Sequence, residues 1–409
     1  MIKGPLNGIR VIDLTKALAG PWGTQILGDF GAEVIKIEGG LEADSTRSRY
    51  ADQAGHRGQS YYFLAFNRNK KSISLDLRTP SGHQAFLELI KISDIVVDNF
   101  RPGSMERMGL GYEELKKVNP RIIMWQHSGF GYSGPYKDRP CYEIIAHGYS
   151  GMLDLTREGP EKPPVRSAAP VCDMSSGFYG VMGILAALHE RDRTGEGQLI
   201  RTSMLAIAMA LMSYQFSYHF CSDEVPKATG SSNIGSVTLG AFKCKDEYVV
   251  LVGGSWQKLA PALGLESMIE DPRFVNITEL LKHREEFREV VEQQLAKKTA
   301  REWLEILIAA DIPAAPMNNL LQATEDPQVK EQGIIKEIEH TLGGKIKTID
   351  NPLSMTQLSG VHESPPLYDQ HTDQVLRELL GYSDKQIEQI RKEQKENKEE
   401  LLRHLQKRK

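Results

Sequence analysis

Short apolar runs and amphipathic stretches alternate along the first half of the chain. The apolar, β-rich runs predict strands at 9–14, 32–37, 72–77, 94–98 and 121–126. The stretches between them have helical spacing and predict helices at 22–30, 80–92 and 112–118, and Thr79 before Pro80 supplies a cap for the second. This order predicts an α/β fold with an open, doubly wound, mostly parallel sheet of the Rossmann-like kind.

The pattern changes in the second half. A strand at 199–203 leads into a helix at 204–220, and residues 223–240 are rich in Ser, Gly and Thr. A hairpin at 241–252 and helices at 279–296 and 300–310 follow, which predicts a smaller α/β domain. We therefore expect 1–205 to form the first part of a large domain, 206–225 a linker helix and 226–326 the small domain. We expect 327–409 to return to the large domain and to end in a charged, solvated or dimer-edge helix.

Composition narrows the class of protein. The 409 residues carry a net charge of −4, with 25% charged and 7% aromatic residues, which argues against a nucleic-acid binder or a disordered chain. The four cysteines lack metal-site or CxxC spacing, so we expect reduced thiols in a cytoplasmic protein. We find no signal-peptide pattern at 1–5 and no apolar stretch of about 20 residues, so no membrane partner is expected. Among the histidines we identify no HExxH motif and no i, i+4 pair with a carboxylate, so we expect no metal site.

One carboxylate stands before a long apolar helix. The run at 178–188, opened by Ser175 and Ser176 and closed by the polar segment 191–195, places Asp173 at the helix N-terminus. Asp is a common N-cap, and that is one interpretation. The other is a nucleophile, because the partial positive charge at a helix N-terminus favours the ionised carboxylate.

The segment 129–134 spells GxGxxG but does not predict a dinucleotide site. Pro135 and the residues up to Pro140 preclude the helix that must present its N-terminus to a pyrophosphate. The segment also follows the fifth strand of the series, not the first. These glycines instead predict a loop at the carboxyl edge of the sheet, where open α/β folds bind ligands.

Many short motifs occur together in one order. They are PLNGIRVIDL (5–14), AGP (19–21), GAEVIKIE (31–38), NRNKKSISLD (67–76), DNFRPG (98–103), RMGL (107–110), SGFG (128–131), RTGEGQ (193–198), PPL (365–367) and HTD (371–373). In this the chain resembles the class III coenzyme A transferases, the CaiB/BaiF-type family of formyl-CoA transferase and carnitine-CoA transferase, to which α-methylacyl-CoA racemases are related. The resemblance implies that CoA moves from an acyl-CoA to a carboxylic acid acceptor. It also implies an interlocked homodimer.

The resemblance assigns roles to particular residues. It implies that Asp173 attacks the thioester and passes through an aspartyl anhydride and an aspartyl-CoA thioester, with Glu143 beside it. It implies no cofactor beyond the CoA substrate. Residues implied to contact CoA are Lys16, Ala17, Leu18, Ala19, Leu75, Arg78, Asn99, Phe100, Arg107 and Tyr142, with Arg107 the expected phosphate ligand. Tyr62 and Gly235 are implied to lie near the substrate.

The chain departs from formyl-CoA transferase at several positions. Leu18 replaces a glutamine, Gly39 replaces an arginine, and the loop 230–236 lacks a glycine run. An apolar Leu18 favours a larger or less polar acyl group than formyl. Three alternatives stay open: a racemase, a non-catalytic CoA-binding protein and a nicotinamide dehydrogenase. The racemase needs a base pair, but Tyr142 stands where that relative has a histidine, and His147 comes five residues later.

Overall fold

The computed structural model describes residues 4–39, 43–49, 55–56, 58–358, 360 and 362–406. Its contacts divide the chain into two compact units. Unit 1 contains 1–147, 169–211 and 333–409, and unit 2 contains 148–168 and 212–332. We had placed 148–168 with the first part of the large domain, whereas these contacts group it with unit 2; the domain boundaries stay a prediction. The terminal basic residues 407–409 lie outside the described residues.

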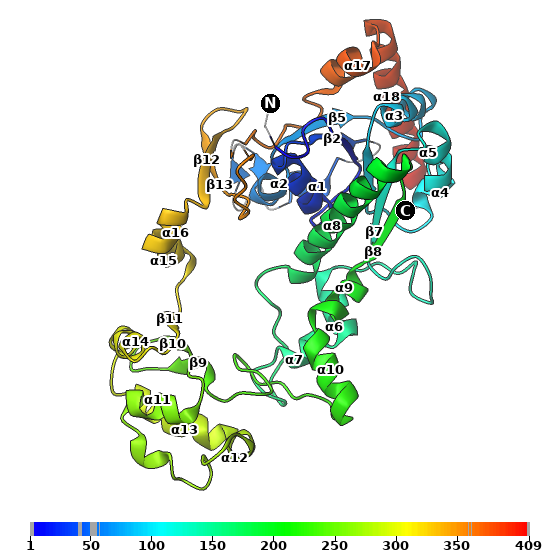
Figure 1. Ribbon diagram of the computed structural model, residues 1–409. Coiled ribbons are helices and arrows are strands. Elements are labelled where there is room, and N and C mark those ends of the chain that lie inside the picture. The colour runs from blue at the N-terminus through cyan, green and yellow to red at the C-terminus, as the bar shows by residue number, and fades with distance from the viewer. Residues whose placement is uncertain are drawn as a thin grey trace. The chain divides into compact units, whose positions relative to one another are not determined.

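Unit 1 is built on a six-stranded parallel sheet with the order β5-β2-β1-β6-β7-β8 (Figure 1). Its strands are β1 (Arg10–Asp13), β2 (Glu33–Glu38), β5 (Lys70–Ser74), β6 (Ile95–Asp98), β7 (Ile123–Ser128) and β8 (Leu199–Ser203). In the register, Val11 pairs with Val34 on one side and with Ile95 on the other. The chain leaves β1 toward β2 and later returns to β1's other side at β6, so the strand order reverses between β1 and β6.

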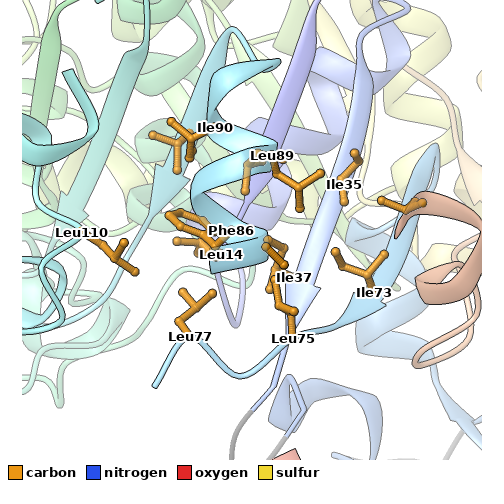
Figure 2. Packing of buried hydrophobic residues seen from close by; sticks show 14 of the residues in the cluster. Leu14, Ile35, Ile37, Ile73, Leu75, Leu77, Phe86, Leu89, Ile90 and Leu110 are labelled. Carbon is orange, nitrogen blue, oxygen red and sulfur yellow. The ribbon is translucent and has the colours of Figure 1, made fainter. Parts of the chain in front are cut away.

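Successive side chains of each strand point to opposite faces of the sheet. Because helices cover both faces, both sets of side chains are buried, and the strand sequences are therefore apolar throughout. Val11, Val34 and Ile95 belong to one core with α1 (Ala19–Asp29) and α8 (Val171–Thr194). Ile12, Ile35 and neighbouring residues belong to a second core with α3 (Pro80–Lys91) and α5 (Tyr112–Val118). Figure 2 shows Phe86, Leu89 and Ile90 of α3 beside Leu14, Ile35 and Ile37 in this core. The doubly wound fold class expected from the sequence is confirmed.

Helix α8 packs closely on the first core. A methyl carbon at Gly180 would stand 2.1 Å from Cζ2 of Trp125, so only glycine allows this approach. Among the described residues α8 is the one helix long and apolar enough to cross a membrane by length and composition. Our expectation that no such stretch exists is therefore wrong, because α8 extends the apolar run at both ends. One side of α8 packs on α1, β7 and β8 of unit 1, and 39% of its apolar window is buried.

The C-terminal segment returns to unit 1. It contains the hairpin β12 (Ile335–Glu339) and β13 (Lys345–Ile349), then α17 (Thr372–Leu380) and α18 (Asp384–Gln406). Ile387 and Ile390 of α18 are buried in the core beneath α3. The first turns of this helix are thus packed, which corrects the interpretation of α18 as a solvated helix. The shorter elements of unit 1 are β3 (Gly55–His56), β4 (Gln59–Ser60), α2 (Tyr61–Phe66), α4 (Ser104–Arg107), α6 (Glu143–Ser150, which runs into unit 2) and α9 (Met204–Leu211).

Unit 2 has its own core around Trp256, Phe274 and Phe287, whose rings meet edge to face. Its antiparallel sheet has the order β11-β10-β9. The elements are α7 (Met152–Leu155), α10 (Ser213–Ser222), β9 (Leu239–Lys243), β10 (Tyr248–Val252), α11 (Trp256–Leu263), α12 (Ile277–Lys282), α13 (Arg284–Leu295), α14 (Ala300–Ala309), β11 (Ala314–Pro316), α15 (Leu320–Glu325) and α16 (Pro327–Gln332).

Several expected elements differ from the structure in their bounds. The helix expected at 204–220 is two helices, α9 and α10, which separate at Met212. The helix expected at 279–296 is likewise divided at His283 into α12 and α13. The cap at Thr79 is confirmed, since its side chain accepts a hydrogen bond from the N–H of Gly82. The expected absence of a helix after the glycines at 129–134 is confirmed for that segment.

Candidate functional site

A pocket of about 450 Å³ opens at the carboxyl edge of the sheet in unit 1. Its walls come from the segments that follow four neighbouring strands. These are Leu14 and Lys16 after β1, Ile37 and Gly39 at the end of β2, Leu75, Asp76, Leu77 and Arg78 after β5, and Phe100 and Met108 after β6. The pocket therefore spans the reversal of strand order between β1 and β6, where doubly wound folds bind nucleotides.

Two of the expected cations stand at this pocket. The Arg78 guanidinium donates from Nε and Nη2 to the two carboxylate oxygens of Asp76, both at 2.9 Å, and Asp76 also accepts from Asn397 of α18. These two parallel hydrogen bonds, the Arg78–Asp76 fork, hold the otherwise exposed guanidinium of Arg78 in one orientation. Lys16 lines the opposite wall. Arg107, the expected phosphate ligand, is exposed on α4 next to Met108 and donates to Ser104 Oγ at 2.9 Å.

The candidate nucleophile lies inside the first turn of α8. Pro170 is the N-cap residue and Asp173 is the third residue of the helix. The helix N-terminus is capped by Glu143, whose carboxylate accepts from the N–H of Cys172 at 3.1 Å and from the N–H of Asp173 at 2.8 Å. The interpretation of Asp173 as the helix cap is therefore wrong, because Glu143 performs that role. Within the described residues, no hydrogen bond to the Asp173 carboxylate is found.

The environment of Asp173 opposes its ionisation. Burial, followed by the neighbouring Glu143 carboxylate, raises the pKa of Asp173 from 3.8 to about 7. We had expected the helix N-terminus to favour the ionised form. That expectation fails because Glu143 takes the N–H groups of the first turn and adds a like charge. Near neutral pH Asp173 is a poorly solvated carboxylate, a state in which a carboxylate is a stronger nucleophile than in water.

Glu143 has a further close partner. His147, one turn later on α6, places Nε2 2.7 Å from Oε1 of Glu143. This i, i+4 pair contradicts our expectation that no histidine is spaced so from a carboxylate. With Cys172 these residues form a group whose ligand atoms lie within 4.8 Å of one another. The His147–Glu143 separation is shorter than the roughly 3.3 Å between two ligands of a tetrahedral zinc. The two side chains are therefore a close His–Glu pair and are too near each other, as they stand, to be two ligands of one zinc ion.

Two thiols flank the candidate nucleophile. Burial, followed by Glu143 and Asp173, raises the pKa of the Cys172 thiol to about 12. Burial, followed by Asp173, raises the pKa of the Cys141 thiol to about 11. Both sulfurs are thus neutral thiols at physiological pH and are weak nucleophiles. Of Cys141, Cys172 and Asp173, only the Asp173 carboxylate ionises near neutrality.

Contacts between α1 and α8 bring the loop before α1 next to Asp173. Gly177 lies one turn after Asp173, and a methyl carbon there would stand 2.7 Å from Trp22 Cδ1 and 3.0 Å from the carbonyl oxygen of Ala19. Glycine at 177 is what permits this approach. The segment 16–19, expected to face the thioester, therefore reaches from the pocket to the helix that carries Asp173.

The remaining expected site residues lie in three places. Tyr62 is half-buried on α2 and meets Phe66 edge to face, and Phe66 meets Trp22 in turn, so Tyr62 is linked to the α1–α8 contact. Tyr142, just before α6, is 69% exposed. Gly235 belongs to unit 2, where its N–H donates to Asn233 Oδ1. The structure thus brings together Asp173, Glu143 and the segment 16–19, while Gly235 is described only with its own unit.

The sequence reasoning missed three groups around the site. The first is the buried ion pair of Lys36 and Asp44, which contacts the loop 15–17; the sequence shows only that these two residues lie eight positions apart. His147 was detectable from its spacing to Glu143 and was overlooked. Asp76 was quoted as part of a motif, but its fork with Arg78 requires a turn that the sequence does not reveal.

Comparisons with known proteins agree with this architecture. The description "CoA-transferase family III" matches residues 6–372. The succinyl-CoA:glutarate CoA-transferase of Homo sapiens is 33% identical over 392 residues, covering 94% of this chain and 88% of that protein. The formyl-CoA:oxalate CoA-transferase of Rhodopseudomonas palustris (strain HaA2) is 32% identical over 413 residues, covering 94% and 96%. A CAIB/BAIF family protein from Brucella suis has a TM-score of 0.81 at 31% identity, covering 92% and 100%.

The fold and site are those of an α/β protein with a pocket at the carboxyl edge of its parallel sheet and a buried carboxylate on helix α8. The chain belongs to CoA-transferase family III, over nearly its whole length. It is accordingly an enzyme that moves CoA between an acyl-CoA and a carboxylate.

Proposed function

We propose that this enzyme transfers CoA through covalent intermediates on Asp173. The observation that carries the proposal is a carboxylate with a pKa raised to about 7, in the first turn of α8, beside the loop that leads to the nucleotide pocket. Neutral thiols at Cys141 and Cys172 leave this carboxylate as the effective nucleophile of the cluster.

The chemistry is an exchange between carboxylates that needs no net proton transfer. An Asp173 oxygen bonds to the thioester carbon and the C–S bond breaks, which gives a mixed anhydride and CoA thiolate. The thiolate attacks the Asp173 carbonyl carbon and expels the donor acid, leaving an aspartyl-CoA thioester. The acceptor carboxylate attacks that carbonyl and releases the thiolate, which then attacks the acyl carbon of the new anhydride. Acyl-CoA leaves, and the Asp173 carboxylate is restored.

The nucleotide part of CoA fits the pocket at the sheet edge by chemistry and by size. Lys16 and Arg78 supply cations for phosphate, and Leu75, Phe100 and Met108 supply apolar surface for an adenine ring. The pocket volume of about 450 Å³ lies within the usual range of roughly 300–1,000 Å³ for small-molecule sites. Arg107 stands at its border on α4 and completes the proposed phosphate site.

We assign a donor or acceptor acid larger than formate or oxalate. Leu18 is buried and begins α1, where formyl-CoA transferase has a glutamine. Gly39 cannot carry a side chain in this conformation, because its Cβ would stand 2.3 Å from the carbonyl oxygen of Leu75. The relatives that act on succinyl-CoA and glutarate favour four- and five-carbon dicarboxylates.

Trapping and a substrate panel test the proposal together. The enzyme is incubated with succinyl-CoA, treated with hydroxylamine or borohydride, digested and analysed by mass spectrometry. Asp173 should carry the hydroxamate or be reduced, and Asp173→Ala should lose both the mark and the transfer. Retained transfer without modification of Asp173 contradicts the mechanism, and strict preference for formyl-CoA contradicts the substrate class. Exchange of an α-proton without transfer would show the racemase.

We also propose a homodimer in which the exposed face of α8 is covered by the partner. Phe178, Tyr179, Met182 and Leu185 are apolar and exposed along this one face. Apolar patches of this kind are typical of interfaces. Native mass spectrometry should show a dimer, and Met182→Glu should weaken it; a monomer at micromolar concentration contradicts the assembly.

A cytoplasmic location completes the proposal. All four cysteines are free, as expected of a reducing compartment. Fractionation of the native host should recover the enzyme with cytoplasmic markers, and recovery in another compartment contradicts this assignment.

A further inference from the structure

The loop between β1 and α1 holds a strained alanine. Ala17 has φ of 68°, in the left-handed region. Of the non-glycine residues with positive φ in the described part of the chain, Ala17 alone is neither Asn nor Asp. For alanine this conformation is disfavoured roughly 5- to 30-fold, so surrounding contacts must hold it.

A buried ion pair lies directly beneath this loop. Lys36 Nζ stands 3.1 Å from Asp44 Oδ2, and both side chains are fully buried. Lys36 Nζ also donates to the carbonyl oxygen of Thr15 at 2.6 Å, and Asp44 Oδ1 lies 3.5 Å from the backbone N of Ala17. The pair thus contacts the loop at Thr15 and at the backbone N–H of the strained Ala17 itself.

The Asn99 side chain completes the restraint from the end of β6. Its amide accepts from the N–H of Lys16 at 2.9 Å and donates to the carbonyl oxygen of Lys16 at 2.7 Å. The loop is therefore fixed at Thr15, Lys16 and Ala17 by Lys36 of β2, by Asp44 in the segment after β2 and by Asn99 after β6. Such over-determination is what allows an unfavourable backbone conformation to persist.

The loop lies between the two parts of the candidate site. Lys16 lines the nucleotide pocket, and the Ala19 carbonyl approaches α8 at Gly177, one turn from Asp173. A change of φ at Ala17 would rotate the chain between these points. The distance from a bound thioester to the Asp173 carboxylate depends on that rotation, and small displacements there reduce rates strongly.

We propose that Lys36 and Asp44 are positioning residues: they hold the strained Ala17 loop in the conformation that presents the acyl-CoA thioester to Asp173. Neither touches the reacting atoms. This inference rests on the proposed function for its catalytic consequence, and on the loop geometry alone for its structural part. It extends the site to a buried pair for which the comparisons name no role.

Combining a variant of the ion pair with a second substitution at Ala17 distinguishes a positioning role of the pair from a contribution to stability alone. Asp44→Asn is chosen over a Lys36 variant because Lys36 keeps Asp13 and Glu38 as neighbouring carboxylates, which favours folding. Asp44→Asn should lower kcat/KM and speed amide hydrogen exchange in the peptide 14–22. Ala17→Gly removes the penalty for positive φ. Added to Asp44→Asn, it should restore kcat/KM by about fivefold or more and slow the exchange again.

The matched control is a second buried ion pair of unit 1. Arg68 and Asp29 lie 2.6 Å apart and both side chains are 1% exposed, but they contact the end of α1 far from Ala17. Asp29→Asn should lower stability without faster exchange in 14–22, and Ala17→Gly should not rescue it. Thermal unfolding of each variant checks that the comparison is made on folded protein.

Two results overturn the inference: unchanged exchange in 14–22 for Asp44→Asn, or equal effects of Ala17→Gly on the Asp44 and Asp29 variants. Failure of the proposed function looks different. In that case the wild-type enzyme transfers CoA without modification of Asp173, while the exchange pattern still supports or overturns the role of the pair in holding the loop.

Discussion

Replacing Asp173 by asparagine should abolish transfer and stabilise the protein increasingly as pH rises. The physical reason is the unfavourable environment of the carboxylate. Its pKa is raised from 3.8 to about 7 in the folded protein, by burial and then by Glu143. The folded state therefore binds a proton that the unfolded state releases at lower pH. The stability that comes from the protonated form is complete below about pH 4 and is lost as pH rises through about 7.

The magnitude follows from the shift. At 1.36 kcal/mol per pKa unit, a change from 3.8 to about 7 costs the ionised folded state about 4 kcal/mol relative to an uncharged side chain. Asparagine has nearly the same shape and no charge. At pH 5.5 the wild-type protein bears only about 2 kcal/mol of this cost, since Asp173 is still mostly protonated when folded. The advantage of Asp173→Asn should thus grow by about 2 kcal/mol between pH 5.5 and 8.5.

Urea unfolding followed by tryptophan fluorescence measures the difference, because Trp22 and Trp125 pack directly against α8. Asp192→Asn, an exposed change on the same helix, is the matched control and should show no growth with pH. A stability difference that stays flat across the range, or that falls with pH, would refute the reasoning. Mass spectrometry of the variant must exclude deamidation back to aspartate.

Three further outcomes are expected. Glu143→Gln should lower the pKa of Asp173 by about one unit, moving the acidic limb of the kcat/KM profile to lower pH, because the like charge is removed. Gly180→Ala should destabilise the protein by at least about 2 kcal/mol in urea unfolding, since its Cβ would stand 2.1 Å from Trp125. Arg78→Ala should raise KM for acyl-CoA roughly tenfold with kcat unchanged, in steady-state kinetics, through loss of a charged hydrogen bond to phosphate.

Each of these three predictions has an outcome or a control variant that would contradict it. An acidic limb that does not move in Glu143→Gln contradicts the assigned cause of the shift. Gly148→Ala, at a helical glycine with open space around it, should be neutral or stabilising, so an equal loss there would discredit the packing argument. Arg121 precedes β7 at the opposite edge of the sheet, and an equal KM effect of Arg121→Ala would contradict the placement of the nucleotide.

Much of the fold was predictable because parallel strands buried on both faces leave continuous apolar runs. The strand at 199–203 and the helix at 112–118 have the predicted bounds. The divisions at Met212 and His283 could not be predicted, since apolar spacing continues through both. The burial of Ile387 and Ile390 also escaped prediction, because a helix dominated by charge hides two residues that pack on α3.

The sequence predicted which residues belong to the candidate site, but it did not predict how their charges and hydrogen bonds affect one another. Asp173 and Glu143 were identified from local pattern and resemblance, and they do lie together. Which carboxylate caps the helix depends on the approach of α6 to α8, and the sequence of the connecting segment 151–170, which includes α7, does not predict that approach. The buried pair of Lys36 and Asp44 was invisible for the same reason, as burial of charge leaves no mark in composition.

The capping by Glu143 explains how one helix N-terminus serves both stability and chemistry. If Asp173 itself accepted the N–H groups of the first turn, those bonds would lower its pKa and occupy the oxygens that must attack. Glu143 accepts them instead, so the helix is capped while the Asp173 oxygens stay available. The exchange moves only carboxylate and thiolate anions, so it gains from a poorly solvated nucleophile more than from an acid or a base. The cost in stability is the one that Asp173→Asn would remove.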